Sequence, residues 1–264
     1  MSLSAARQIA NRHPLAIQPL IKNSNTKNIP NFPPEIIRII LGLIKDDKKT
    51  INACATVNHT FNLHATPILY HTVSFSFPYT FTLFAKAILG ESQRPRMIRH
   101  LDLSGFSTMG LQKSDATIQT VITPEILISI LRSCTMLETF SVSETLTSTI
   151  NLEVLRVLVF ECKNIKTLDF CGLSSKHFGS ALTSLAEYMG RLRLVQDYED
   201  DDEKEPTYSF QSVKNVALPD LQRLSLHNCS IISEYSTILT LLAHAPNITH
   251  LDLGGCSVSE MTLN

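Results

Sequence analysis

The four-residue string His-Leu-Asp-Leu occurs twice in the chain, at residues 100–103 and 250–253. Each copy belongs to a longer pattern, in which an apolar residue is followed by two more, three and five positions later. The pattern occurs in five clear places, which are Ile98/Leu101/Leu103, Leu137/Phe140/Val142, Ile165/Leu168/Phe170, Leu221/Leu224/Leu226 and Ile248/Leu251/Leu253. A motif that returns in this way indicates stacked structural repeats rather than a catalytic centre.

The spacing of the five sets predicts a sixth. Their first residues stand 39, 28, 56 and 27 positions apart. Because 56 is twice 28, another unit is expected midway, and Met189, Leu192 and Leu194 have the required spacing. About six units therefore run from residue 98 to residue 264, the last of them incomplete.

The L-x-x-L-x-L form resembles the signature of leucine-rich repeats. In the short L-x-L segment, alternate side chains point into the core and those between them face the opposite surface. The rest of each unit predicts a helix: Pro124, for example, follows the N-cap residue Thr123 at the start of an apolar run. We expect an α/β solenoid with parallel strands on a concave face and helices on the convex face.

Six cysteines follow the repeat. Cys134 and Cys162 lie three residues before the first apolar residue of a unit, whereas Cys229 and Cys256 lie eight residues after it. These positions resemble the cysteine-containing class of leucine-rich repeats, in which buried thiols act as small apolar fillers. No Cys-x-x-Cys or zinc-finger spacing occurs, so no metal or cofactor is expected.

Several segments depart from the repeat. Residues 107–120 are a polar insertion, and residues 197–206 hold seven acids against one lysine, which predicts a solvated loop. Residues 1–28 lack Asp and Glu; we interpret them as a disordered tail, with a transit peptide as the alternative. We expect weak order beyond about residue 256.

The front of the chain has a different character. In residues 29–75, a proline-rich entry leads to a broad apolar helical face, and the turn KDDKK separates it from a second helix. That second helix is expected to carry the stripe Ile51, Cys54, Val57 and Phe61. Forty residues cannot hide this much aliphatic surface alone, which indicates a protein partner. Residues 76–97 predict a linking helix.

This front module resembles an F-box, whose pattern begins Leu-Pro-x-Glu with following aliphatics and continues with Leu-x5-Val-x3-Trp. The chain has Phe-Pro-Pro-Glu-Ile-Ile at 32–37, then Ile51, Val57 and Phe61 at matching intervals. Phe32 replaces the leucine and Phe61 the tryptophan. The order of F-box and repeats is similar to that of fungal F-box proteins with leucine-rich repeats.

The resemblance implies a non-enzymatic role: an F-box binds the Skp-type adaptor of a cullin-based ubiquitin ligase, and the repeats bind a target protein. The implied adaptor-binding residues are Phe32, Pro33, Ile36, Ile40, Val57 and Phe61. The target-binding residues expected on the concave face are His100, Asp102, Asp169, Arg191, Arg193, Arg223, His250 and Asp252. The target itself is unknown.

The overall charge and the distribution of apolar residues argue against several other functions. A formal net charge of −1 gives no reason to expect nucleic acid or a membrane surface as partner, and no run of 18 apolar residues occurs. We expect a cytoplasmic or nuclear protein. One alternative is an enzyme, although no G-x-S-x-G, P-loop or H-E-x-x-H motif is present. The other is a leucine-rich-repeat scaffold unrelated to ubiquitination, whose front helices act as a solenoid cap.

Overall fold

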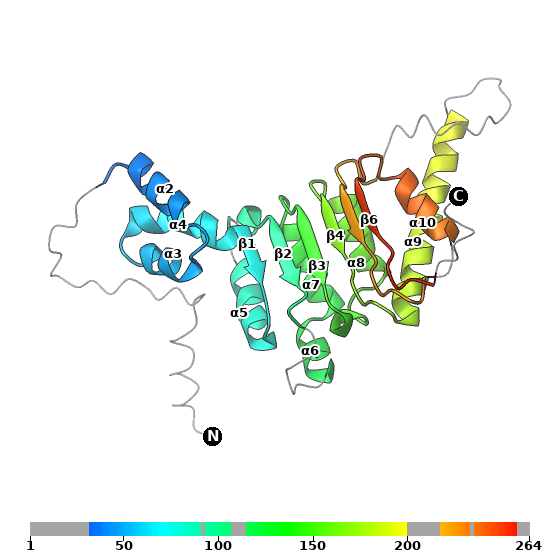
Figure 1. Cartoon of the computed structure of the whole chain (residues 1–264), viewed down its shortest axis with the longest axis horizontal. Helices are drawn as coiled ribbons and strands as arrows, with labels where there is room; N and C mark the ends of the chain where they lie inside the picture. The colour runs from blue at the N-terminus through cyan, green and yellow to red at the C-terminus, as the bar shows by residue number, and fades with distance from the viewer. Residues whose placement is uncertain (1–31, 91–92, 107–114, 200–216, 233–234, 258–264) are drawn as a thin grey trace. The chain divides into compact units, whose positions relative to one another are not determined.

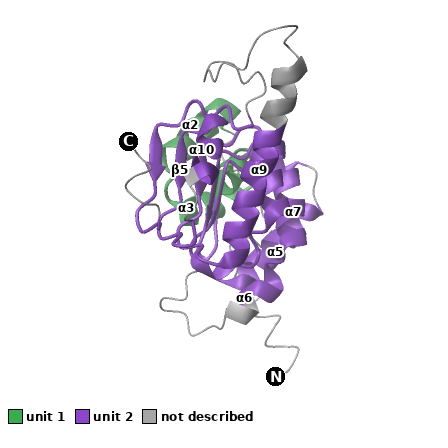
Figure 2. Ribbon diagram, turned by 90° about the vertical axis from the view of Figure 1, so that its right-hand side faces the viewer, with its two compact units in different colours: residues 1–72 green, residues 73–264 purple. Residues whose placement is uncertain are grey.

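A computed structural model describes residues 32–90, 93–106, 115–199, 217–232 and 235–257. The expected tail at 1–28 lies outside these residues, as do most of the acidic insertion and the chain after residue 257. The chain divides into two compact units, residues 1–72 and 73–264, which are coloured separately in Figure 2.

Unit 1 is helical (Figure 1). Its helices are α2 (Pro34–Leu43), α3 (Lys48–Ala55) and α4 (His59–His71). Pro34 stands at the start of α2, where a missing N–H costs nothing, and the Asp47 side chain caps α3 by accepting from Lys49 and Thr50. A small core of buried residues joins the helices: Ile37, Leu41, Ile51, Ala55 and Ala65.

The single second helix predicted for this unit is wrong, because α3 and α4 are separate. The chain leaves helical geometry after Ala55, and the extended Asn58 starts a new helix by accepting a hydrogen bond from the Phe61 N–H at 2.9 Å. Asparagine is among the strongest N-cap residues. Its hydrogen bond therefore starts a new helix at this point, even though the apolar stripe of the sequence continues through it.

Unit 2 contains a six-stranded sheet whose strands lie in chain order, β1 to β6 (Figure 1). The strands are β1 (Thr72–Ser74), β2 (His100–Leu103), β3 (Thr139–Val142), β4 (Thr167–Asp169), β5 (Arg223–Ser225) and β6 (His250–Asp252). From β2 to β6 every neighbouring pair is parallel. Parallel strands joined in order require a crossover between each pair.

The crossover segments are mostly helical and cover one face of the sheet (Figure 2). They are α5 (Pro78–Leu89), η1 (Arg94–Met97), α6 (Asp115–Val121), α7 (Pro124–Ser133), η2 (Glu144–Leu146), α8 (Leu152–Arg156), η3 (Val157–Glu161), α9 (Lys176–Glu199) and α10 (Tyr235–Ala243). The predicted start of α7 is confirmed: Thr123 caps it and Pro124 is its first residue. The predicted linking helix corresponds to α5.

The hydrogen bonds between strands repeat from unit to unit. In each step from β2 to β6, one carbonyl accepts from two successive N–H groups of the next strand, as Arg99 does from Glu138 and Thr139. The accepting residues in order are Arg99, Glu138, Lys166 and Gln222. Asn164 and Asn247 also stand at matching positions, and each donates its side-chain amide to a carbonyl of the preceding step. Sequence-equivalent residues thus occupy equivalent places.

The predicted strand at Met189, Leu192 and Leu194 is wrong. All three residues lie within α9, and β4 pairs directly with β5, with Thr167 opposite Arg223. Apolar residues three positions apart also share one side of a helix, so this spacing did not distinguish the two structures. The 56-residue interval therefore holds one long helix and residues 200–216, which are outside the described part.

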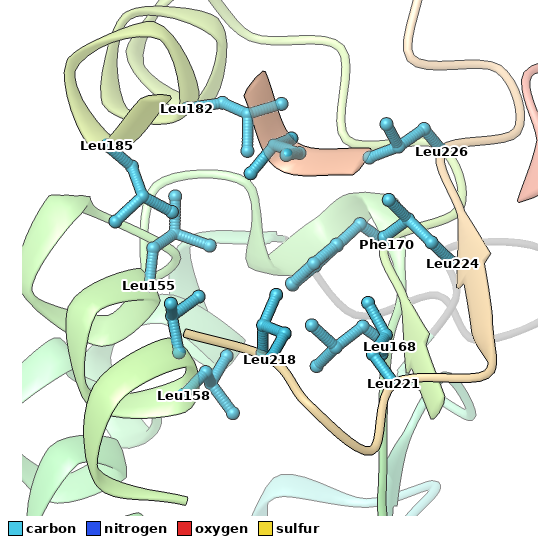
Figure 3. A pocket seen from close by; sticks show the side chains of 12 residues that line it. Leu155, Leu158, Leu168, Phe170, Leu182, Leu185, Leu218, Leu221, Leu224 and Leu226 are labelled. Carbon is cyan, nitrogen blue, oxygen red and sulfur yellow. The ribbon is translucent and has the colours of Figure 1, made fainter. Parts of the chain in front are cut away.

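The core lies between the sheet and the helices. The inward residues of β2 and β3, for example Leu101 and Phe140, are fully buried. Between β4, β5 and the helices α8 and α9 there is an apolar cavity of about 20 Å³ (Figure 3). It has room for about one water, but its lining of leucines, Val159 and Phe170 offers no polar partner, so we interpret it as a packing void rather than a ligand site.

Candidate functional site

Helix α2 carries apolar residues on two sides, and only one of them is covered. Ile37 and Leu41 are buried in the core of unit 1. The opposite flank, which we name the α2 surface, consists of Ile36, Ile39, Ile40 and Leu43. These side chains are 42%, 59%, 36% and 82% exposed. At 100° per residue they span an arc of about 100°, the width of a helix face that normally packs on a core.

The predicted adaptor-binding residues divide into two groups. Phe32, Pro33, Ile36, Ile40 and Val57 are exposed, whereas Phe61 is half-buried and packs against the core of unit 1. Pro33 also starts the helix, because its carbonyl accepts from the N–H groups of Ile36 and Ile37. Sequence reasoning missed Ile39, Leu43 and the 59% exposed Leu63. The run of five aliphatics within 36–41 was the available signal, since one helix face cannot bury them all.

The second candidate surface is the helix-free face of the sheet in unit 2. Two columns of outward side chains cross it in register. One column is His100, Thr139, Thr167, Arg223 and His250. The other, which we name the Asp column, is Asp102, Ser141, Asp169, Ser225 and Asp252. The sheet thus brings together six of the eight predicted target-binding residues.

The other two, Arg191 and Arg193, lie on α9 and not on a strand, so their assignment to this face is wrong. Arg191 is exposed and forms an ion pair with Glu187, one turn earlier on the same helix, at 3.7 Å. Both arginines were placed on the sheet only because the segment was interpreted as a strand.

The aspartates of the Asp column have a structural role. Each accepts a hydrogen bond from the backbone N–H two residues further on: Asp102 from Ser104 at 2.9 Å, Asp169 from Cys171 at 3.1 Å and Asp252 from Gly254 at 2.9 Å. This bond closes the turn that follows each strand. At Asp252, the Gly254 N–H and then His227, at 3.3 Å, hold the pKa of the carboxyl below its usual range.

A third set of charges flanks the columns and was not predicted. Glu138 lies between two cations of neighbouring strands, Arg99 at 3.1 Å and Lys166 at 2.8 Å, and the hydrogen bond from Lys166 is the main cause that lowers the Glu138 pKa. His227 stands near the other end of the strands. These three residues could have been found from the sequence, because Arg99, Glu138 and Lys166 each directly precede a member of the first outward column.

Cys171 lies two residues after Asp169 of the Asp column. Burial, then Asp169 and Asp252, raise the pKa of the Cys171 thiol, which is the opposite of what a nucleophilic cysteine needs. Within the described ranges, no group of three His, Cys, Asp or Glu side chains is placed to hold a metal ion. In the same residues, no helix combines the length and apolar character that a membrane span requires.

Comparison with known proteins identifies the front of the chain. Residues 29–109 match the model of the COS11 F-box domain, which supports an F-box in this part of the chain. The match extends from unit 1 through α5 and β2 of unit 2.

A curated relative agrees with this assignment. The F-box protein COS111 of Candida glabrata is 33% identical over 99 residues, which make up 38% of this chain and 10% of that protein. The chain thus matches about a tenth of the length of this relative.

Proposed function

We propose that the chain is the substrate-recognition subunit of an SCF-type ubiquitin ligase, which binds a Skp-type adaptor through its F-box and a target protein through leucine-rich repeats. The observation that carries the proposal is the coincidence of the F-box domain with the exposed α2 surface. F-box domains bind adaptors, and an adaptor supplies the apolar partner that this surface lacks. The cullin is reached through the adaptor, so the chain itself performs no chemistry and acts by proximity.

The energetics of the α2 surface favour a stable complex. Burial of apolar surface contributes roughly 25 cal/mol per Å², so covering four aliphatic side chains of this size contributes several kcal/mol in total. The two most exposed of them, Leu43 at 82% and Ile39 at 59%, have the most apolar surface to bury. Residues that become well packed and fully desolvated near the centre of an interface carry most of its binding energy.

The repeating architecture of unit 2 supports the second half of the proposal. A leucine-rich-repeat solenoid has parallel strands in chain order and helices on one face of the sheet, as unit 2 has. At each step of unit 2, the carbonyl at the equivalent position accepts from the equivalent two N–H groups of the next unit. Its helix-free face presents Arg223, His250 and the Asp column to solvent. A mixed-charge face selects partners by complementary potential rather than by apolar area.

Copurification with a recombinant Skp-type adaptor tests the first half. The wild-type chain is expected to form a stable complex, and the pair Ile40→Asp and Leu43→Asp to abolish it. Leu239→Asp is the matched control, because Leu239 is 41% exposed on α10 and lies outside the matched residues 29–109. Circular dichroism verifies that each variant is folded. Absence of a complex with the wild-type chain would favour the scaffold alternative.

Affinity capture with mass spectrometry tests the second half. Ligase subunits should disappear from the capture when Ile40 and Leu43 are replaced, whereas target proteins should remain. Arg223→Glu should have the reverse effect, because it changes the charge of an exposed side chain on the sheet. If Arg223→Glu leaves the whole capture unchanged, target binding through this face is wrong.

A further inference from the structure

The last strand of the sheet leaves apolar side chains uncovered. Leu251 of β6 is 36% exposed, although its equivalents on the four preceding strands are almost fully buried. Those equivalents are Leu101 at 0%, Phe140 at 0%, Leu168 at 3% and Leu224 at 6%. Leu253 is also half-buried, while Leu226, its counterpart on the preceding step, is fully buried. Among the strands that the structure describes, β6 thus lies at one edge of the sheet in unit 2 (Figure 1).

Helix α10 adds to this open end. Thr237 and Thr240 face α9: the Thr237 hydroxyl lies 3.5 Å from that of Thr183, and the Thr240 methyl lies close to Gly190. At 100° per residue, Leu239 and Leu242 lie on the opposite side of α10. Leu239 is 41% exposed and Leu242 half-buried. Four leucines, two from β6 and two from α10, therefore line the end of the core.

The backbone of β6 is arranged for another strand. The His250 N–H donates to Gln222, and the Asp252 carbonyl accepts from Leu226, so both residues direct their backbone groups towards β5. Because these groups alternate along a strand, the N–H and C=O of Leu251 point away from the sheet. An edge of this kind is a template for pairing with another chain.

We propose that β6 is a self-association edge, at which a second copy of this chain pairs its own β6 in the antiparallel direction with Leu251 opposite Leu251. In that register Leu251 exchanges two backbone hydrogen bonds with its counterpart, and the leucines of both copies close the exposed core ends. His250 then stands opposite Asp252 of the second copy, twice by symmetry. The triplet His250-Leu251-Asp252 is therefore self-complementary.

Charge selects the antiparallel register. A parallel pairing of the same strand would place Asp252 against Asp252, which is unfavourable because like charges would stand directly opposite each other. The antiparallel pairing also closes as a two-fold dimer. Asp252 is 54% exposed at its side chain and carries a second carboxylate oxygen beyond the one that accepts from Gly254.

Sedimentation equilibrium of the 264-residue chain, from roughly 1 µM to 1 mM, tests the proposal. The wild-type chain should show a reversible monomer–dimer equilibrium. His250→Asp should weaken the dimer about tenfold or more, because two attractive pairs become repulsive, whereas His250→Lys should retain it. Leu251→Lys, at a half-exposed position, should also abolish the dimer without unfolding the chain.

The matched control is His100→Asp, the same change in the same column on the interior strand β2. It should leave the dimer constant unchanged. A wild-type chain that stays monomeric over the whole range overturns the proposal. So does an equal effect of His100→Asp and His250→Asp, which would indicate a general charge effect rather than pairing at β6.

Discussion

At the scale of single residues, one position after each of the strands β4, β5 and β6 decides how the chain turns away from the sheet. Gly172, Asn228 and Gly255 all have positive φ, at 79°, 59° and 74°. Each stands seven residues after the first apolar residue of its unit. Only glycine and, less readily, asparagine adopt this left-handed conformation without strain. This conformation explains why glycine stands at this position after β4 and β6, and asparagine after β5.

Gly172→Ala is expected to lower the free energy of unfolding of unit 2 by roughly 1–2 kcal/mol, because alanine is strained at positive φ. Its Cβ would also lie 3.2 Å from the Cβ of Glu144. Gly190→Ala is the control: it lies within α9 with only the Thr240 methyl nearby, at 4.0 Å, so it should raise stability by roughly 0.5–1 kcal/mol. Urea unfolding measures both, and an equal effect of the two variants would contradict the assignment.

The buried thiols predict a pH dependence. Burial raises the pKa of Cys134 and of Cys162 to about 12. The unfolded chain releases these protons near pH 8.5, so the contribution of each thiol to stability is complete below that pH and is lost as the pH rises towards 12. At pH 10 the expected loss is roughly 2 kcal/mol for each thiol.

Urea unfolding at pH 7.5 and at pH 10 measures this loss, and Cys162→Ala isolates one thiol. Lysine and tyrosine titrate in the same range, but they contribute equally to the variant and the wild type. The variant should therefore lose less stability between the two pH values. An identical loss in both proteins would show that the Cys162 thiol ionises as readily in the folded chain as in the unfolded one.

At the scale of elements, the strands could be predicted from the sequence more accurately than the helices. The outward and inward residues of β2 to β6 follow from the L-x-x-L-x-L spacing, and the four observed registers match it. The same spacing failed at Met189, because apolar residues three apart satisfy a helix equally well. Only the pairing of β4 with β5 excludes a strand there, and pairing depends on residues far away in the chain.

Of the two candidate surfaces, one could be predicted residue by residue from the sequence and the other only in part. The Asp column could be predicted because period-two alternation assigns each strand residue to one face. The α2 surface could be predicted only as excess apolar area: the sequence did not show which isoleucines of 36–40 were buried. That choice depends on where α4 crosses α2, so Ile37 became core and Ile39 remained exposed.

At the scale of the whole molecule, unit 2 is a stack in which each layer contacts its neighbours. Helix α7 packs on α5 and α8, α8 packs on α9, and α10 packs on α9. In such a stack, stability is a sum of layer terms and nearest-neighbour terms, so an end layer can open without the rest. All three residues of β6 are exposed, so we expect the last described layer to have the lowest stability of the stack.

Ile238→Ala and Ile130→Ala test this by hydrogen exchange. Ile238 in α10 is 1% exposed and Ile130 in α7 is fully buried, so each variant creates a cavity that costs roughly 2–4 kcal/mol. Ile238→Ala should remove protection from the amides of β5, β6 and α10 but leave β2 and β3 protected. Ile130→Ala, in an interior layer, should lower protection on both sides of it. Equal loss across the whole sheet in Ile238→Ala would mean that unit 2 opens as one cooperative block, because the coupling between layers then exceeds the cost of the cavity.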